Sequence, residues 1–201
     1  MFAAAAFFGL KPLVLTTARL HLRPYEPADA DVFFAVLDQS RARLQHSFPD
    51  RLQSVPTLAA ACAQLAAFAQ DWRTGRFYVF GIWHQQTYAY LGDICLMPQR
   101  AGQAEIGYYL AAEAEGQGYA REALGAIVQF GFEQVGATRL LIRCFADNER
   151  AQQVAQAHGF RLQTEEPATE GRPWFRFSFW DNSPPLPTIL HFMRLRQPVG
   201  P

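Results

Sequence analysis

A glycine-containing segment near the middle of the chain has the residue types of a phosphate-binding turn. Gly116 and Gly118 lie between a predicted strand, residues 105–110, and a predicted helix whose apolar residues from Ala120 onward have helical spacing. Glycines at such a turn let the backbone approach a ligand closely, and the first N–H groups of the helix carry partial positive charge. The segment therefore predicts a phosphate or pyrophosphate site; a plain glycine turn is the alternative.

Asn148 marks a second place where the chain could contact a bound ligand. It follows a predicted strand, residues 139–145, and precedes a predicted helix that ends before the pair Gly159-Phe160. Its side chain can cap that helix, and it can also reach a ligand bound beside the strand.

These two segments together resemble the GNAT N-acetyltransferases, and within that family the RimJ/RimL type, which acetylates protein N-termini and small amines. The signature Gln/Arg-x-x-Gly-x-Gly/Ala is matched by residues 115–120, and the second signature by Asn148 with Gly159-Phe160. The resemblance covers nearly the whole chain. It implies an α+β fold with a mixed, mostly antiparallel central sheet, flanked by helices and splayed between the fourth and fifth strands.

The resemblance also implies acetyl-CoA as the acyl donor. The pantetheine arm would pair with exposed backbone of the fourth strand, and backbone N–H groups of the glycine turn would hold the pyrophosphate. The matching positions are Leu110 and Ala112 in the strand, Gly116, Gln117, Gly118, Tyr119 and Ala120 in the turn, and Asn148 beside the pantetheine arm.

Acyl transfer to an amine requires a base that accepts the ammonium proton, directly or through water. Glu105, on the strand that leads into the glycine turn, is our first candidate for this base, and Asp93 on the preceding strand is the second. The alternative role for Glu105 is a structural salt bridge with Arg143 on the neighbouring strand.

The resemblance leaves the acid that would protonate the departing thiolate unidentified. Family members use a Tyr or a Ser in the helix after the Asn, and the matching positions here are Ala155 and Ala151. The thiolate could also leave unaided, because a thiol has a pKa of about 8.5. Glu115 replaces the family's Gln or Arg, and we expect this to weaken cofactor binding only modestly because the turn binds through its backbone.

The order of predicted elements is β-α-α-β-β-β-α-β-α-β-β, in one domain over residues 1–201 with an apolar tail at 1–13. Residues 14–24 predict the first strand, a helix opens at Pro27, and residues 41–56 finish that helix and become a loop. Thr57 is expected to cap the second helix and Gly75 to end it. The further strands are expected at residues 77–83, 88–96, 105–110 and 139–145; residues 160–164 open a last antiparallel section whose final strands are expected at 174–180 and 189–195.

Composition excludes several classes of function. The formal net charge is zero, which gives no electrostatic argument for a nucleic-acid partner. No apolar run approaches the roughly twenty residues of a membrane span. Cys62, Cys95 and Cys144 lack metal or disulfide spacing and are interpreted as reduced core thiols of a cytoplasmic protein. The histidines lack metal-ligand spacing, so we expect no metal; His46, on the predicted acceptor-side loop, is the one expected near the site.

Two alternatives to an acetyltransferase stay open at this stage. The missing Ser and Tyr fit a non-catalytic CoA-binding or regulatory module. The glycine turn alone would fit an unrelated nucleotide-binding protein, although no acidic residue follows at the spacing of a ribose contact. The identity of the acceptor amine is not readable from the sequence.

The apolar tail and the aromatic C-terminal strands, 174–180 and 189–195, together predict a homodimer, because they give more apolar surface than a monomer usually exposes. Sedimentation velocity at micromolar concentration should show a species of twice the chain mass. A monomer under those conditions would contradict this expectation.

Overall fold

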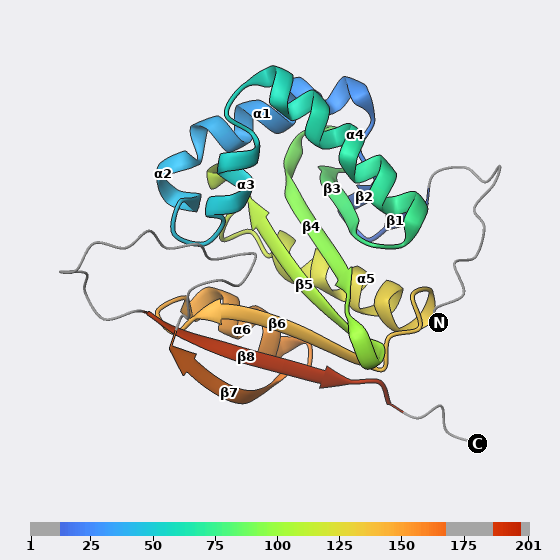
Figure 1. The fold of residues 1–201 in the computed structure, drawn as a ribbon, viewed down its shortest axis with the longest axis vertical. Coiled ribbons are helices and arrows are strands. Elements are labelled where there is room, and N and C mark those ends of the chain that lie inside the picture. The colour runs from blue at the N-terminus through green and yellow to red at the C-terminus, as the bar shows by residue number, and fades with distance from the viewer. Residues whose placement is uncertain (1–12, 168–186, 198–201) are drawn as a thin grey trace.

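The computed structural model describes residues 13–167 and 187–197, which form an eight-stranded sheet with helices on both faces (Figure 1). The strand order in the sheet is β1-β2-β3-β4-β5-β6-β8-β7. The strands are β1 (Leu15–Thr16), β2 (Leu20–Arg23), β3 (Tyr78–His84), β4 (Tyr90–Pro98), β5 (Gln103–Leu110), β6 (Arg139–Phe145), β7 (Arg161–Pro167) and β8 (Thr188–Leu195).

The sheet is antiparallel except at its centre, where β5 and β6 run parallel. Their pairing begins at Gln103–Arg139 and ends at Ile106–Ile142, although both strands continue beyond it. The carboxyl halves of β5 and β6 therefore separate, which is visible in Figure 1. This confirms the predicted mixed sheet, splayed between the fourth and fifth predicted strands.

The helices are α1 (Ala30–Gln39), α2 (Arg41–Leu44), α3 (Pro49–Ser54), α4 (Leu58–Thr74), α5 (Tyr119–Glu133) and α6 (Glu149–Ala157), with 3-10 turns η1 (Pro27–Asp29), η2 (Arg100–Gly102) and η3 (Ala112–Ala114). The predicted ends of α4 are confirmed. The Thr57 hydroxyl oxygen accepts a hydrogen bond of 3.2 Å from the Ala60 N–H, and Gly75 ends the helix with a φ of 68°.

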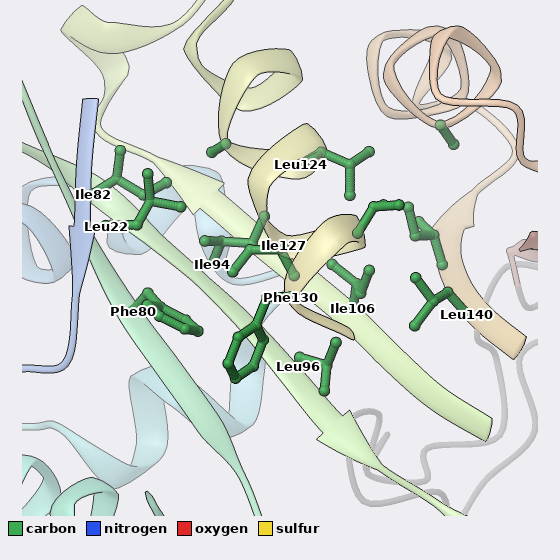
Figure 2. Packing of buried hydrophobic residues seen from close by; sticks show 14 of the residues in the cluster. Leu22, Phe80, Ile82, Ile94, Leu96, Ile106, Leu124, Ile127, Phe130 and Leu140 are labelled. Atoms are coloured by element: carbon green, nitrogen blue, oxygen red, sulfur yellow. The ribbon is translucent and has the colours of Figure 1, made fainter. Parts of the chain in front are cut away.

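Helix α5 packs its apolar face onto one side of the sheet (Figure 2). Leu124, Ile127 and Phe130 have the spacing of one helical face, and all three are buried. They meet Ile94 of β4 and Ile106 of β5 in the same cluster. This contact fixes the helix that follows the glycine turn against the strand that precedes it.

Helices α1 and α4 cover the opposite face of the sheet. Phe33 of α1 and Phe68 of α4 pack with their ring centroids 6.3 Å apart, nearly edge to face. Both belong to a cluster that includes Val79, Cys95 and Tyr109 of the sheet. Successive side chains of a strand point to opposite faces of the sheet, so each strand contributes residues alternately to the two clusters.

Two regional predictions were wrong. Residues 14–24 form two short antiparallel strands rather than one, because the Thr17 N–H donates to the Leu20 carbonyl at 2.9 Å and turns the chain. Residues 41–56 contain α2 and α3 rather than a loop, with Pro49 at the first position of α3. Both short helices lie beside the opening between β5 and β6 (Figure 1).

The three cysteines differ in their exposure. Cys95 is buried and Cys144 half-buried, whereas Cys62 is exposed on α4, so the interpretation of all three as core thiols was wrong for Cys62. The predicted strand at 174–180 and nearly all of the apolar tail lie outside the described residues.

A bulge beside Gly92 lies where the start of β4 pairs with the end of β5. Leu91 is the extra residue of a bulge on β4, and its carbonyl accepts a hydrogen bond of 2.8 Å from the Ala111 N–H. Gly92 itself has a φ of 138°, and a β-carbon there would lie 2.2 Å from the Tyr109 carbonyl oxygen. Any larger residue must therefore displace the backbone of β5.

Gly92→Ala should lower the free energy of unfolding by roughly 3 kcal/mol, because the clash is with backbone in an unfavourable region of φ. Urea denaturation measures the loss. Gly136→Ala is the matched control, since Gly136 also has positive φ, 74°, but a β-carbon there meets no atom within 4 Å. We expect a cost of about 1 kcal/mol for the control; equal losses would contradict the steric argument at Gly92.

Candidate functional site

The glycine turn has the backbone geometry of an anion site. Gly116 and Gly118 have φ of 75° and 80°, values that favour glycine. The first backbone bond at the start of α5 runs from the Glu122 N–H to the Gly118 carbonyl, at 3.1 Å, so earlier N–H groups have no partner within the helix. A β-carbon at Gly116 would meet no atom within 4 Å, which places this glycine beside open space.

Arg19, in the turn between β1 and β2, holds the glycine turn in place. Its Nη1 donates to the Gln117 carbonyl at 3.0 Å, and its Nε forms an ion pair of 2.7 Å with Glu122. Burial alone would raise the pKa of Glu122, but hydrogen bonds from Thr17 and Arg19 outweigh it and lower that pKa. The guanidinium also lies 4.6 Å from the ring centre of Tyr119, the first residue of α5.

The splayed end of β5 carries Leu110, one of the predicted cofactor positions. Its carbonyl accepts a hydrogen bond of 2.5 Å from Nη2 of Arg43 in α2. Ala112 differs from Leu110 because it opens η3, and its carbonyl accepts from the Glu115 N–H at 3.2 Å. The backbone edge without a β6 partner is therefore residues 107–110.

Glu115, which departs from the family pattern, is paired with two arginines. Arg43 of α2 forms an ion pair with one carboxylate oxygen, and Arg150 of α6 lies 3.1 Å from the other. These arginines come from helices on the two sides of the opening. The negative charge beside the turn is thus balanced by two positive charges.

Asn148 has the capping role that the sequence allowed for its position. Its side-chain oxygen accepts a hydrogen bond of 3.0 Å from the Ala151 N–H and so caps α6. The cap uses only the oxygen, and the amide NH₂ group can still donate to a ligand. Asn148 also lines the space between β5 and β6.

Three adjoining cavities follow the opening between β5 and β6. The first, which we call the splay cavity, has a volume of about 110 Å³ and lies between the two strands. Its lining includes Glu105, Tyr108, Cys144, Asn148 and Ala151.

The splay cavity adjoins a larger cavity on each side. The mouth cavity, about 430 Å³, shares Ser47, Phe145 and Asn148 with it. The wide cavity, about 630 Å³, shares Met97, Glu105 and Arg143 with it. A ligand in the splay cavity would thus have the mouth cavity at one end and the wide cavity at the other.

Glu105 lies on the boundary between the splay cavity and the wide cavity. One carboxylate oxygen is 2.6 Å from both Nε and Nη2 of Arg143, and the other accepts from Nε2 of Gln99 at 2.8 Å. The side chains of the ion pair are 12% and 8% exposed. The salt bridge considered from the sequence is therefore present, and it orients the carboxylate at the junction. A carboxylate has about four lone-pair directions, which leaves room for a further donor.

Asp93 lies deeper in the protein and lines none of the three cavities. It is 1% exposed, 3.4 Å from Nη1 of Arg51, and accepts a hydrogen bond of 3.2 Å from the Tyr25 hydroxyl. Burial raises the pKa of Asp93, although Arg51 and nearby tyrosine hydroxyls work against the shift. Its contact with Arg51 connects it indirectly to the wide cavity, which Arg51 lines.

The remaining predicted positions are placed as follows. Ala151 lines the splay cavity, and Ala155 is buried at 1% exposure; neither can donate a proton. His46, expected near the site, lines the mouth cavity and stacks on Phe145 with ring centroids 4.0 Å apart. Tyr119 and Ala120 begin α5 directly after the turn.

Sequence reasoning missed Arg19, Arg43 and Arg150. Arg19 contacts a carbonyl 98 positions later, and Arg43 pairs with a carboxylate 72 positions later, so no local pattern marks either. Within residues 13–167 and 187–197 there is no group of three or more His, Cys, Asp or Glu arranged to hold a metal. Nor does that part of the chain contain a helix long and apolar enough to cross a membrane.

Comparison with known proteins places these features in one family. The profile of the acetyltransferase (GNAT) domain matches residues 19–161. The uncharacterized N-acetyltransferase YoaA of Bacillus subtilis is 27% identical over 152 residues, 75% of this chain and 84% of that protein. The ribosomal-protein-serine acetyltransferase of Escherichia coli is 38% identical over 60 residues, 30% of this chain and 34% of that protein.

A solved structure shows the same fold. RimL, a ribosomal L7/L12 α-N-protein acetyltransferase in complex with coenzyme A, superimposes with a TM-score of 0.77 at 18% identity, covering 91% of this chain and 98% of that one. The domain match spans well over half of the chain, and its relatives carry the same activity in their names. The chain therefore belongs to the GNAT acetyltransferase family, with RimJ/RimL-like relatives, and is an acetyl-CoA-dependent N-acetyltransferase.

Proposed function

We propose that this enzyme transfers the acetyl group of acetyl-CoA to a primary amine by direct attack, with Glu105 as the general base. The observation that carries the proposal is the position of Glu105, whose carboxylate lines both the splay cavity and the wide cavity. A base at that junction can reach an amine that enters from one cavity and attacks a thioester in the other.

The donor occupies the mouth cavity and the splay cavity in this proposal. The turn at residues 116–120 holds the pyrophosphate through backbone N–H groups, and the pantetheine arm pairs with the β5 edge at residues 107–110. Asn148 faces this arm with its free amide group. Arg43 then gives up its bond to the Leu110 carbonyl. The coenzyme A bound in the RimL neighbour supports the same use of the fold.

The acceptor enters through the wide cavity. This cavity is lined by charged groups of both signs, including Glu105, Arg143 and Arg51, so it suits a polar acceptor rather than an apolar one. A protein N-terminus is the first acceptor to test, because relatives are named for acting on ribosomal proteins. Small-molecule amines form the second half of the panel, with release of free thiol as the readout.

Direct attack is favoured over a covalent enzyme intermediate. Cys95 and Cys144 are the thiols that line the splay cavity, but burial raises the pKa of Cys95 to about 12 and that of Cys144 to about 11. A thiol with such a pKa is almost entirely protonated near pH 7, and the thiolate is the reactive form. The amine therefore attacks the thioester carbonyl itself, and its proton passes to Glu105 directly or through a water.

Gly116→Ala should weaken binding of coenzyme A by at least about tenfold, because the β-carbon enters the space expected for the pyrophosphate. Titration calorimetry with coenzyme A measures the change. Gly136→Ala is the matched control, since Gly136 has nearly the same φ, 74° against 75°, and the same open surroundings but lies at the other end of α5. Equal affinities of the two variants would contradict the assignment of the turn.

Glu105→Gln should lower kcat by about a hundredfold to ten-thousandfold, the usual contribution of a general base. The affinity for acetyl-CoA should hardly change, because backbone groups hold the cofactor. Part of the lost rate should return at high pH, where more of an acceptor with an amine pKa near 8 is already neutral.

Arg143→Gln provides the control for the broken ion pair. Either substitution leaves one buried partner without its counter-charge and should destabilise the protein by roughly 3 kcal/mol. Only Glu105→Gln removes the base, so Arg143→Gln should keep much more turnover in a folded sample. If the two variants lose equal activity with the same pH profile, Glu105 is structural.

A further inference from the structure

The hydroxyl of Tyr108 is a buried polar group without a hydrogen-bond partner among the described residues. Buried polar groups in folded proteins are nearly always hydrogen-bonded, so such an exception calls for an explanation. Tyr108 lines the splay cavity, the space that the thioester must occupy in the proposed function.

The position of Tyr108 in the sheet places it on the splayed part of β5. It lies two residues beyond Ile106, where pairing with β6 ends. Cys144 of β6 and Ala151 line the same cavity. Ala151 is the position at which the resemblance would place a Ser whose hydroxyl protonates the departing thiolate. Burial raises the pKa of Tyr108 well above its ordinary value, and the nearby Cys144 adds to the shift.

We propose that Tyr108 is a catalytic residue, whose hydroxyl donates a hydrogen bond to the thioester sulfur as negative charge develops there. This inference rests on the proposed function, because it requires the thioester of acetyl-CoA in the splay cavity. The hydroxyl is held by the strand and is not engaged by another protein group in the described structure. It can therefore meet the sulfur without first breaking a protein hydrogen bond.

Tyr108 acts in this step without losing its proton. The ammonium first gives one proton to Glu105, which passes it on to solvent. The N–C bond then forms, the C–S bond breaks with its electron pair staying on sulfur, and the second proton of the nitrogen goes to Glu105. A thiol has a pKa of about 8.5, far below that of buried Tyr108, so the departing thiolate is too weak a base to deprotonate it. The product leaves as a hydrogen-bonded thiolate that takes its proton from solvent.

Tyr108→Phe tests this role with almost no change of shape. We expect kcat to fall about tenfold to a hundredfold, the range for losing a hydrogen bond to a charged group, with little change in KM for acetyl-CoA. The melting temperature should stay the same or rise, because the variant removes a buried group that lacks a partner. Tyr78→Phe is the matched control, since Tyr78 is also partly buried but lines none of the three cavities.

The second measurement reports on the sulfur itself. The pKa of the thiol of bound coenzyme A, followed through the ultraviolet absorbance of its thiolate, should be about one unit higher in Tyr108→Phe than in the wild type or Tyr78→Phe. A tyrosine that only supports the fold would lower stability when truncated and would leave this thiol pKa unchanged.

The outcomes separate this inference from the function it rests on. Wild-type turnover in Tyr108→Phe, or an unchanged thiol pKa in the bound coenzyme, overturns the role of Tyr108 and leaves the acetyltransferase assignment intact. A wild type that binds coenzyme A but acetylates no amine overturns the proposed function, and this inference with it. A lower kcat together with the raised thiol pKa supports both.

Discussion

The organisation of the site depends on where the parallel pairing of β5 and β6 stops. Each strand remains paired along its outer edge, β5 with β4 as far as Leu110 and β6 with β8 as far as Phe145. Only the inner edges separate, after Ile106 and Ile142. Backbone N–H and C=O groups on those edges need partners when they are buried, and a ligand with amide groups of its own can supply them. The same gap therefore forms the cavity and gives it backbone groups that could bind such a ligand.

Helix α5 holds the two strands in this arrangement. At its C-terminal end it approaches the sheet so closely that a β-carbon at Gly131 would lie 2.7 Å from Leu96 and 3.0 Å from Leu140. Leu96 belongs to β4 and Leu140 to β6, so this contact packs one helix against strands on both sides of β5 (Figure 2). The N-terminal end of the same helix carries the glycine turn. Packing in the core thus sets the position of the glycine turn relative to the cavity.

The parts of the fold that the sequence could predict are those that depend on neighbouring residues. The cap at Thr57, the glycine turn and strand β6 each follow from a few adjacent side chains, and their boundaries were predicted closely. The turn that divides β1 from β2 was missed because it depends on local hydrogen bonds of Thr17. The pattern of apolar residues, from which the strand was predicted, does not reveal such bonds. The helices within 41–56 were missed because they are shorter than the patterns that identify a helix.

In the candidate site, too, the sequence predicted what depends on neighbouring residues and missed contacts between distant ones. Positions such as Asn148 were found from motifs, whereas the arginine contacts to the turn and to Glu115 join residues far apart in the chain. The salt bridge of Glu105 with Arg143 was anticipated, but not the position of Glu105 between two cavities. That position depends on the separation of two strands, and no single segment encodes it.

The alternation of side chains along β5 explains how one short strand can serve both ends of the reaction. Glu105 and Tyr108 are an odd number of residues apart, so they project to opposite faces of the sheet. Glu105 lies toward the wide cavity on the side of α4, and Tyr108 packs with the cluster under α5. A thioester in the gap between the strands would have the proposed base on the side where the amine enters and the proposed hydrogen-bond donor on the other. In the proposed binding mode backbone groups hold the cofactor, so Glu115, Ala151 and Ala155 can depart from the family pattern without removing either group.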